Sequence, residues 1–228
     1  MADAITERTR PRRAGALLGG GTAGNEQLTA TVGALLLVLL AVLGVTIIRI
    51  GQLLWLHLFL GLLLIGPVAL KMGSTGYRFV RYYAADPPYR RKGPPPIELR
   101  LLAPLVVAST IAVFVTGVIL LLEGPAATTG LVIFHKPSLL FWHKVTFFIW
   151  LGATALHVLG HLVGLPRSMR AVRETRSGLP GLEPGAGGRM LAVWGAIALG
   201  ALIAVALLPD FGTWTSAHFH HLHHFGNG

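Results

Sequence analysis

Five long apolar runs without a single charged residue decide what this chain can fold into. They occupy residues 28–48, 53–70, 101–122, 145–166 and 191–208. A helix needs about 20 apolar residues to cross the hydrocarbon core of a bilayer, and each run is close to that length. With 53% hydrophobic and only 12% charged residues, the chain is too apolar for an ordinary water-soluble domain. The sequence therefore predicts an all-α integral membrane protein, a bundle of about five transmembrane helices.

This pattern divides the chain into three parts. A basic N-terminal tail covers residues 1–27, the transmembrane domain covers 28–208, and a histidine-rich tail covers 209–228. The first apolar run is too long for a signal peptide, and no A-x-A-like cleavage site follows it, so we expect it to remain as a mature helix. The fourth helix is expected to begin before its apolar run, near Ser138, because Pro137 suits a first helical turn.

Basic residues are distributed unevenly along the chain. Sixteen of the nineteen Lys and Arg residues lie in the N-terminal tail and in segments 71–100 and 166–190, and only Arg49, Lys136 and Lys144 lie elsewhere. Short loops rich in Lys and Arg are retained in the cytoplasm. We therefore expect a multi-pass protein of the cytoplasmic membrane, with the N-terminus inside and the C-terminus outside. The same clustering accounts for the net charge of +10 without a nucleic-acid partner.

Several classes of site are excluded by residues or motifs that the chain lacks. It has no cysteine, which excludes disulfides, thiolate metal sites, Cys-ligated iron–sulfur clusters and covalent haem attachment. The phosphate-binding G-x-x-x-x-G-K-[ST] motif, the hydrolase motif G-x-S-x-G and the metalloprotease motif H-E-x-x-H are also missing. Hydrolysis is therefore unsupported, and the sequence nominates no catalytic residue.

Four histidines lie within the predicted membrane helices, where an ionisable side chain is costly and is by default a functional-site hypothesis. His57 is in the second helix, and His143, His157 and His161 are in the fourth. His57 and His143 each lie about five residues from the outer end of their helices, so they are expected at similar depth and could bind one metal from opposite sides. His157 follows His143 by fourteen residues, about 21 Å along the axis, and projects from nearly the same face. His161 lies one turn further, near the cytoplasmic interface.

The residues around these histidines resemble a known family. They are His57, Gly61 and Gly66 on one helix, and His143, Lys144 and the His-Val-Leu-Gly-His segment 157–161 on the other. They look like membrane b-type cytochrome subunits, the four-helix haem proteins that serve respiratory formate dehydrogenases and hydrogenases. The resemblance covers roughly residues 50–165. It implies non-covalent haem b with axial histidines, and electron exchange between a quinone pool and a redox partner protein or larger respiratory complex.

The histidines supply both axial ligands of one haem but not all the ligands of two haems. We expect His57 and His143 to be the axial ligands of one haem b, with His157 as the candidate ligand of a second. Because His157 and His161 lie on one helix, they cannot occupy both faces of one haem, and an interfacial role is expected for His161. On the resemblance, all four histidines are candidate cofactor-binding residues, and the first three are candidate iron ligands.

A lysine and a methionine are candidates to complete the inner site. Lys71 follows His57 by fourteen residues, the same interval that separates His143 from His157. Lys71 or its neighbour Met72 would then lie near the level of His157, and either side chain can supply a lone pair to iron. Pro67 is expected to kink the intervening turn, and a lysine at the cytoplasmic end of a membrane helix is ordinary. Snorkelling of Lys71 to the interface is therefore the default expectation.

Two other interpretations of the intramembrane histidines stay open. In a small assembly protein they would only satisfy local hydrogen bonds within the bundle. In a transporter or metal-handling protein they would relay protons or ions, and the C-terminal tail would capture metal. That tail has the composition of a metal-binding tract, with histidines at His218, His220, His221, His223 and His224. A solvated tail without bound metal fits the same composition.

Overall fold

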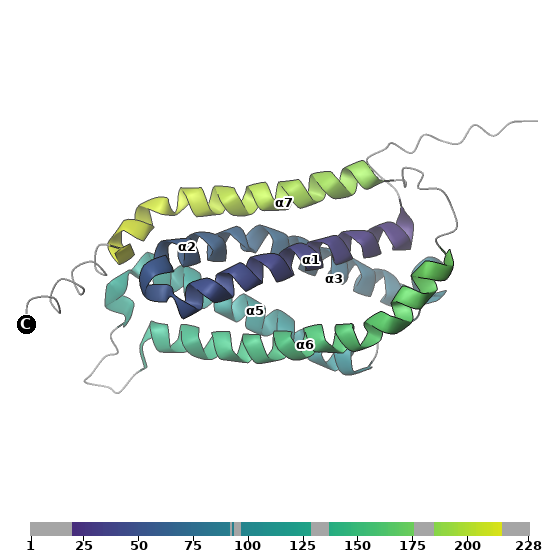
Figure 1. Cartoon of the computed structure of the whole chain (residues 1–228), viewed down its shortest axis with the longest axis horizontal. Coiled ribbons are helices and arrows are strands. Elements are labelled where there is room, and N and C mark those ends of the chain that lie inside the picture. Colours follow the sequence, from purple (N-terminus) through teal and green to yellow (C-terminus); the bar gives the residue numbers. More distant parts are fainter. Residues whose placement is uncertain (1–19, 92, 94–96, 129–136, 176–184, 216–228) are drawn as a thin grey trace, which may run out of the picture.

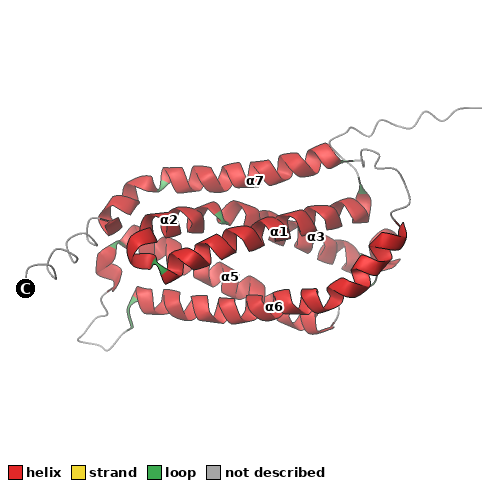
Figure 2. Cartoon of the chain, viewed as in Figure 1, coloured by secondary structure: helices red, strands yellow, loops and turns green. Residues whose placement is uncertain are grey.

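The computed structural model of this chain describes residues 20–91, 93, 97–128, 137–175 and 185–215. Within them the structure is helical, with short loops and no strand (Figures 1 and 2). Five helices are long and apolar enough to cross a membrane, as the apolar runs predict. The protein is therefore a multi-pass, all-α membrane protein. The basic residues before position 20 and the C-terminal histidines lie outside the described residues.

The chain passes along the bundle five times. The helices are α1 (Gly21–Ile48), α2 (Ile50–Leu63), α3 (Ile65–Tyr83), α4 (Pro87–Arg91), α5 (Ile97–Glu123), the 3₁₀ helix η1 (Pro125–Thr128), α6 (Leu139–Thr175) and α7 (Ala186–Ala206). Only Arg49 separates α1 from α2, and α2 and α3 together form one span of 34 residues. Residues 208–215 continue as a further helix after a turn at Leu207.

Two helices continue well past the C-terminal ends of their apolar runs. The second span continues beyond the run 53–70 as far as Tyr83, and α6 continues beyond the run 145–166 as far as Thr175. α6 also begins at Leu139, next to the expected start near Ser138. Apolar runs mark only the part of a helix that lies in hydrocarbon, whereas Arg, Met, Ala and Glu continue a helix readily in the polar interface.

The two ends of the bundle differ in composition, and we name them by their contents (Figure 1). The hairpin end holds the α1–α2 turn at Arg49, η1 and the beginning of α6. The basic end holds the beginnings of α1, α5 and α7 and the end of α3. At the basic end Arg81 pairs with Asp86 and lies over the rings of Tyr77 and Tyr89, each 5.8 Å from the guanidinium carbon. This cluster ties α4 to α3.

The helices form two groups. α1, α2, α3 and α7 pack together, while α6 packs along α5 and joins the rest mainly through α5. Among the described residues, α6 has no close packing with α2 or α3. The hydrophobic core is also in two parts, which lie at the hairpin end (Leu62, Leu121, Ala204 and Phe211) and around the middle of α1 (Val32, Leu36 and Leu64). The described bundle therefore consists of a four-helix group and an α5–α6 pair.

The segment that follows α7 is part of the packed structure. Phe211 is almost fully buried, at 2% exposure, in the core of the hairpin end. The indole N–H of Trp214 donates to the carbonyl of Leu121 at the end of α5, over 3.1 Å. The first residues of the expected C-terminal tail, 209–215, are therefore helical and anchored to the bundle.

Candidate functional site

His57 lies on α2 near the hairpin end and is held by a threonine of the preceding helix. Its Nδ1 atom is 3.0 Å from Oγ1 of Thr46, a buried residue of α1. The Thr46 hydroxyl is also 2.6 Å from the carbonyl of Leu43, one turn earlier on the same helix. Because the single hydroxyl hydrogen is used in this shorter bond, the Thr46 oxygen accepts from the N–H at Nδ1 of His57.

His143 lies on α6 and is held in the same way by a threonine of α5. Its Nδ1 atom is 3.0 Å from Oγ1 of Thr116, whose hydroxyl donates to the carbonyl of Ala112 over 2.8 Å. The carbonyl of Val113, a second acceptor, also lies beside the ring. Gly117 leaves room for this approach, since a Cβ atom there would lie only 3.0 Å from Cε1 of the imidazole. His143 is therefore seated directly on the backbone of α5.

The two rings thus share one hydrogen-bonding pattern. When Nδ1 carries the hydrogen, Nε2 carries the lone pair that can bind a metal. Histidines that ligate metals almost always donate their other N–H to a protein acceptor, which sets the tautomer and the ring orientation. His57 and His143 each have such an acceptor. These contacts use Nδ1 of each ring, and Nε2 is the atom that would bind a metal.

The fold brings His57 and His143 to the same end of the bundle from two helices that do not pack closely together. The rings are near enough for a charge on one to act on the other. Gly61, one turn after His57, has no atom within 4 Å of the position that a Cβ would take. A flat macrocycle bound between helices requires ligands from two helices and small residues beside them, and His57, His143 and Gly61 meet these two requirements.

His157 and His161 lie together on α6, nearer the basic end. Their rings meet edge to face with 4.7 Å between centroids. Nδ1 of His157 is buried and has no hydrogen-bond partner among the described residues, whereas His161 is exposed. The ligand groups of this inner site are therefore asymmetric, because both imidazoles come from α6.

Lys71, the candidate partner of this inner site, is bonded to α1. Its Nζ atom donates to the backbone carbonyl of Thr29 on α1, over 2.7 Å. Gly33 provides the space, because a Cβ there would lie 3.1 Å from Nζ. Lys71 is still near enough to act electrostatically on His157 and His161. Ligation of iron by Lys71 would require it to give up its bond to α1.

The two threonines are the site residues that sequence reasoning did not identify as partners of the histidines. Each belongs to a different helix from the histidine that it holds, so no spacing within one helix reveals the pairing. The signal in the sequence is only that Thr46 and Thr116 are hydroxyl residues within apolar runs, a property that other residues of these runs share. Such residues are also ordinary helix-packing devices in membranes.

The described part of the chain offers no site for a metal ion that needs three or more side-chain ligands. No three His, Asp or Glu side chains come together there in a way that could hold a metal ion. The histidine tract from His218 to His224 lies outside the described residues.

Comparisons of the chain with models of known protein families, with curated proteins and with solved structures give no match.

Proposed function

We propose that this protein is a membrane cytochrome that binds haem b and transfers electrons, with His57 and His143 as the two axial ligands. The observation that carries the proposal is the matched pair of imidazoles at the hairpin end, each oriented by a threonine on a neighbouring helix. The two imidazoles come from separate helices, α2 and α6, as ligation from opposite faces of a haem requires. Two histidines are sufficient for this cofactor, and no larger cluster of ligands is needed.

The surroundings of the two rings support this cofactor over a bare metal ion. α2 and α6 are not packed closely, and the position of Gly61 is open. The helices on either side are apolar over most of their length, which suits a hydrophobic macrocycle. A small hydrated ion would instead call for additional carboxylate, carbonyl or water ligands.

The chemistry assigned to the chain follows from the residues present. Haem b would supply a one-electron carrier that is held without covalent attachment. The chain would bind it through Nε2 of His57 and His143, and the threonines would keep both rings in the tautomer that has this lone pair. Two histidine ligands leave no open position for a substrate, so the arrangement favours electron transfer over catalysis at the metal.

The membrane context supports a place between a quinone pool and a redox partner protein. We propose that the basic end faces the cytoplasm, since it carries most of the Lys and Arg residues. The haem would then lie near the opposite face of the cytoplasmic membrane. A carrier in that position can exchange electrons with lipid-soluble quinones and with a protein docked at the membrane surface.

The test is the optical spectrum of the full-length protein purified from a haem-replete host. Reduced-minus-oxidised spectra are expected to show a low-spin haem b at about one haem per chain. His57→Ala and His143→Ala should each abolish this signal, whereas His161→Ala, a change of the same kind at an exposed position, should retain it. Full haem content with an unchanged spectrum in both of the first two variants would disprove the assignment, as would a wild-type protein without haem.

A further inference from the structure

A second group of polar side chains lies at the basic end, about where a lipid headgroup region would be. Lys71 directly follows the second apolar run, 53–70, and is bonded to Thr29, the second residue of the first run, while His161 lies in the last two turns of the run 145–166. Both side chains are thus near the end of the apolar sequence on their helices. Lys71 and Arg78 come from α3, and His157 and His161 come from α6.

The two helices that carry this group are not extensively packed together. Among the described residues, α3 and α6 are not one of the closely packed helix pairs. Lys71 and Arg78 nevertheless lie near His161, and Lys71 also lies near His157. The polar group therefore lies where α3 and α6 approach each other, a region that we call the α3–α6 seam.

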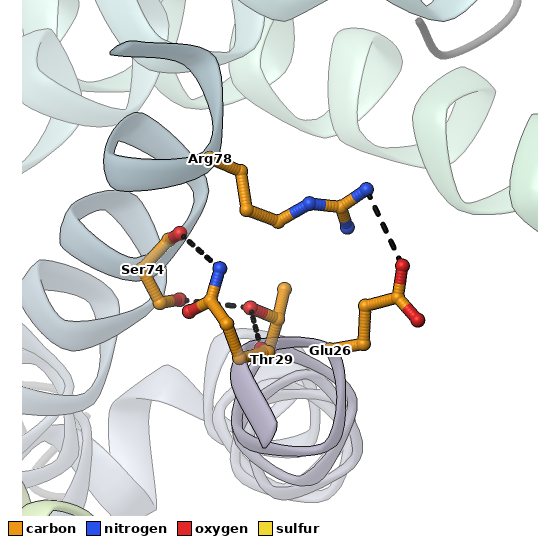
Figure 3. Close-up of polar contacts among 5 residues, drawn as sticks. Glu26, Thr29, Ser74 and Arg78 are labelled. Carbon is orange, nitrogen blue, oxygen red and sulfur yellow. Dashed lines mark hydrogen bonds and ion pairs between the residues drawn. The ribbon is translucent and has the colours of Figure 1, made fainter. Parts of the chain in front are cut away.

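The polar contacts of α3 on its other side, toward α1, are largely satisfied (Figure 3). Arg78 pairs with Glu26 over 3.6 Å, and Thr29 shares a hydrogen bond of 3.1 Å with Ser74. Asn25 donates to the carbonyl of Ser74 over 3.2 Å. These contacts fasten α1 to α3 and use the acidic residue nearest to Arg78.

Lys71 and His157, by contrast, have hydrogen-bonding capacity that remains unused in the described part of the chain. An ammonium group has three donors, and the hydrogen bond found for Lys71 among the described residues goes to a neutral carbonyl. Nδ1 of His157 is buried without a partner in the same part of the chain. Lys71 is half-buried, and a partly buried cation that is bonded to a neutral carbonyl gains from a counter-charge, just as the unpartnered Nδ1 gains from a hydrogen-bond partner. An acceptor with negative charge in the α3–α6 seam would supply both.

We propose that an anionic phospholipid of the leaflet at the basic end binds in the α3–α6 seam, with its phosphate near Lys71, Arg78 and the two histidines. Basic pockets between membrane helices at this level are suited to such headgroups. The acyl chains would cover the apolar surface of α6 beside the seam, where Leu156 and Leu159 are exposed. The level of the cations at the edge of the apolar spans favours a lipid over a phosphate ion from solution. This site is separate from the haem site and does not depend on it.

The experiment uses the full-length protein, purified in detergent and depleted of lipid. Binding of phosphatidylglycerol and of phosphatidylcholine is measured by native mass spectrometry, with inorganic phosphate as a further probe. Wild type should retain phosphatidylglycerol in preference to phosphatidylcholine and should not bind inorganic phosphate. Loss of one cation should weaken phosphatidylglycerol binding roughly fivefold, as expected for a charge near a lipid headgroup.

The variants Lys71→Gln and Arg78→Gln remove one cation each from the seam. Lys144→Gln removes the same charge from an exposed position at the hairpin end of α6 and serves as the matched control. His161→Ala, at an exposed position, tests the α6 side should the Lys71 variant fail to fold. Equal retention of the two lipids, or equal weakening by Lys144→Gln, would overturn the proposal. So would saturation of the seam by inorganic phosphate or by a co-purified quinone in place of phospholipid.

Discussion

Nδ1 of His57 lies 3.0 Å from Oγ1 of Thr46, and this one contact joins the second span to the first at the hairpin end. The same distance separates His143 from Thr116 on a different pair of helices. The threonines are therefore positioning residues, which act on a bound cofactor through the imidazoles. Their replacement should alter the cofactor without removing its ligands.

Thr46→Val and Thr116→Val should each weaken haem binding by roughly 10- to 100-fold, because an outer partner of a ligating histidine contributes on this scale. Titration of haem into apoprotein gives the affinity, and a reductive titration gives the midpoint potential. A matched control is Thr154→Val on α6, where the buried hydroxyl has no partner among the described residues. Thr46→Ser keeps a hydroxyl at this position and should therefore preserve the contact. Unchanged affinity and potential in both Val variants would show that the threonines do not position the rings.

The crossing of α3 and α7 makes a prediction about stability. A Cβ on Gly66 would overlap the carbonyl of Ala196, and a Cβ on Gly200 would overlap the carbonyl of Leu63, so the two backbones touch here. Pro67 has no N–H to bond the Leu63 carbonyl, which leaves this oxygen facing α7. Gly66→Ala and Gly200→Ala should each destabilise the protein by about 1–3 kcal/mol through overpacking.

The measurement is the thermal unfolding midpoint in detergent. Gly195→Ala is the control on the same helix, because its Cβ would meet no atom within 4 Å and alanine favours helix over glycine. It should leave the midpoint unchanged or raise it. Equal midpoints for Gly200→Ala and Gly195→Ala would mean that the close crossing of α3 and α7 does not contribute to stability.

The inner histidines make a prediction about the number of haems. The amine of Lys71 is bonded to α1, so we expect neither Lys71→Gln nor Met72→Leu to change the haem content. A ratio of about one haem per chain by pyridine haemochrome assay, unaffected by His157→Ala, would agree with a single site. A ratio near two, with loss of one haem in His157→Ala and in one of the other variants, would instead establish the mixed-ligand inner haem.

Topology supplies a prediction that needs no cofactor. The loops at the basic end hold most of the Lys and Arg residues, so that end should be cytoplasmic. A reporter that is active only outside the cytoplasm should work when fused after Gly228 and fail when fused within residues 177–188. The reverse result would invert the protein in the membrane and place the proposed haem near the cytoplasmic face.

The sequence alone determined the number of membrane spans and the depth of the residues within them. The thickness of a bilayer imposes a requirement along one dimension, and uncharged runs of about 20 residues report it directly. Depth along a helix follows from residue number at about 1.5 Å per residue. This is why the histidines at 57 and 143 could be paired by counting, and why α6 begins next to the expected Ser138.

Only the tertiary structure decided which side chains meet across helices. The partners of His57 and His143 depend on how each helix is rotated about its axis and on which helices are neighbours, and the apolar runs carry little information on either. For the same reason the sequence did not predict the bond from Lys71 to Thr29, which turns the lysine toward α1, or the bond from Trp214 to Leu121. In a membrane, apolar surface can face lipid as well as protein, so the hydrophobic pattern does not specify which face of a helix packs. Close glycine contacts and interhelical hydrogen bonds do specify it, and these form only once the bundle is assembled.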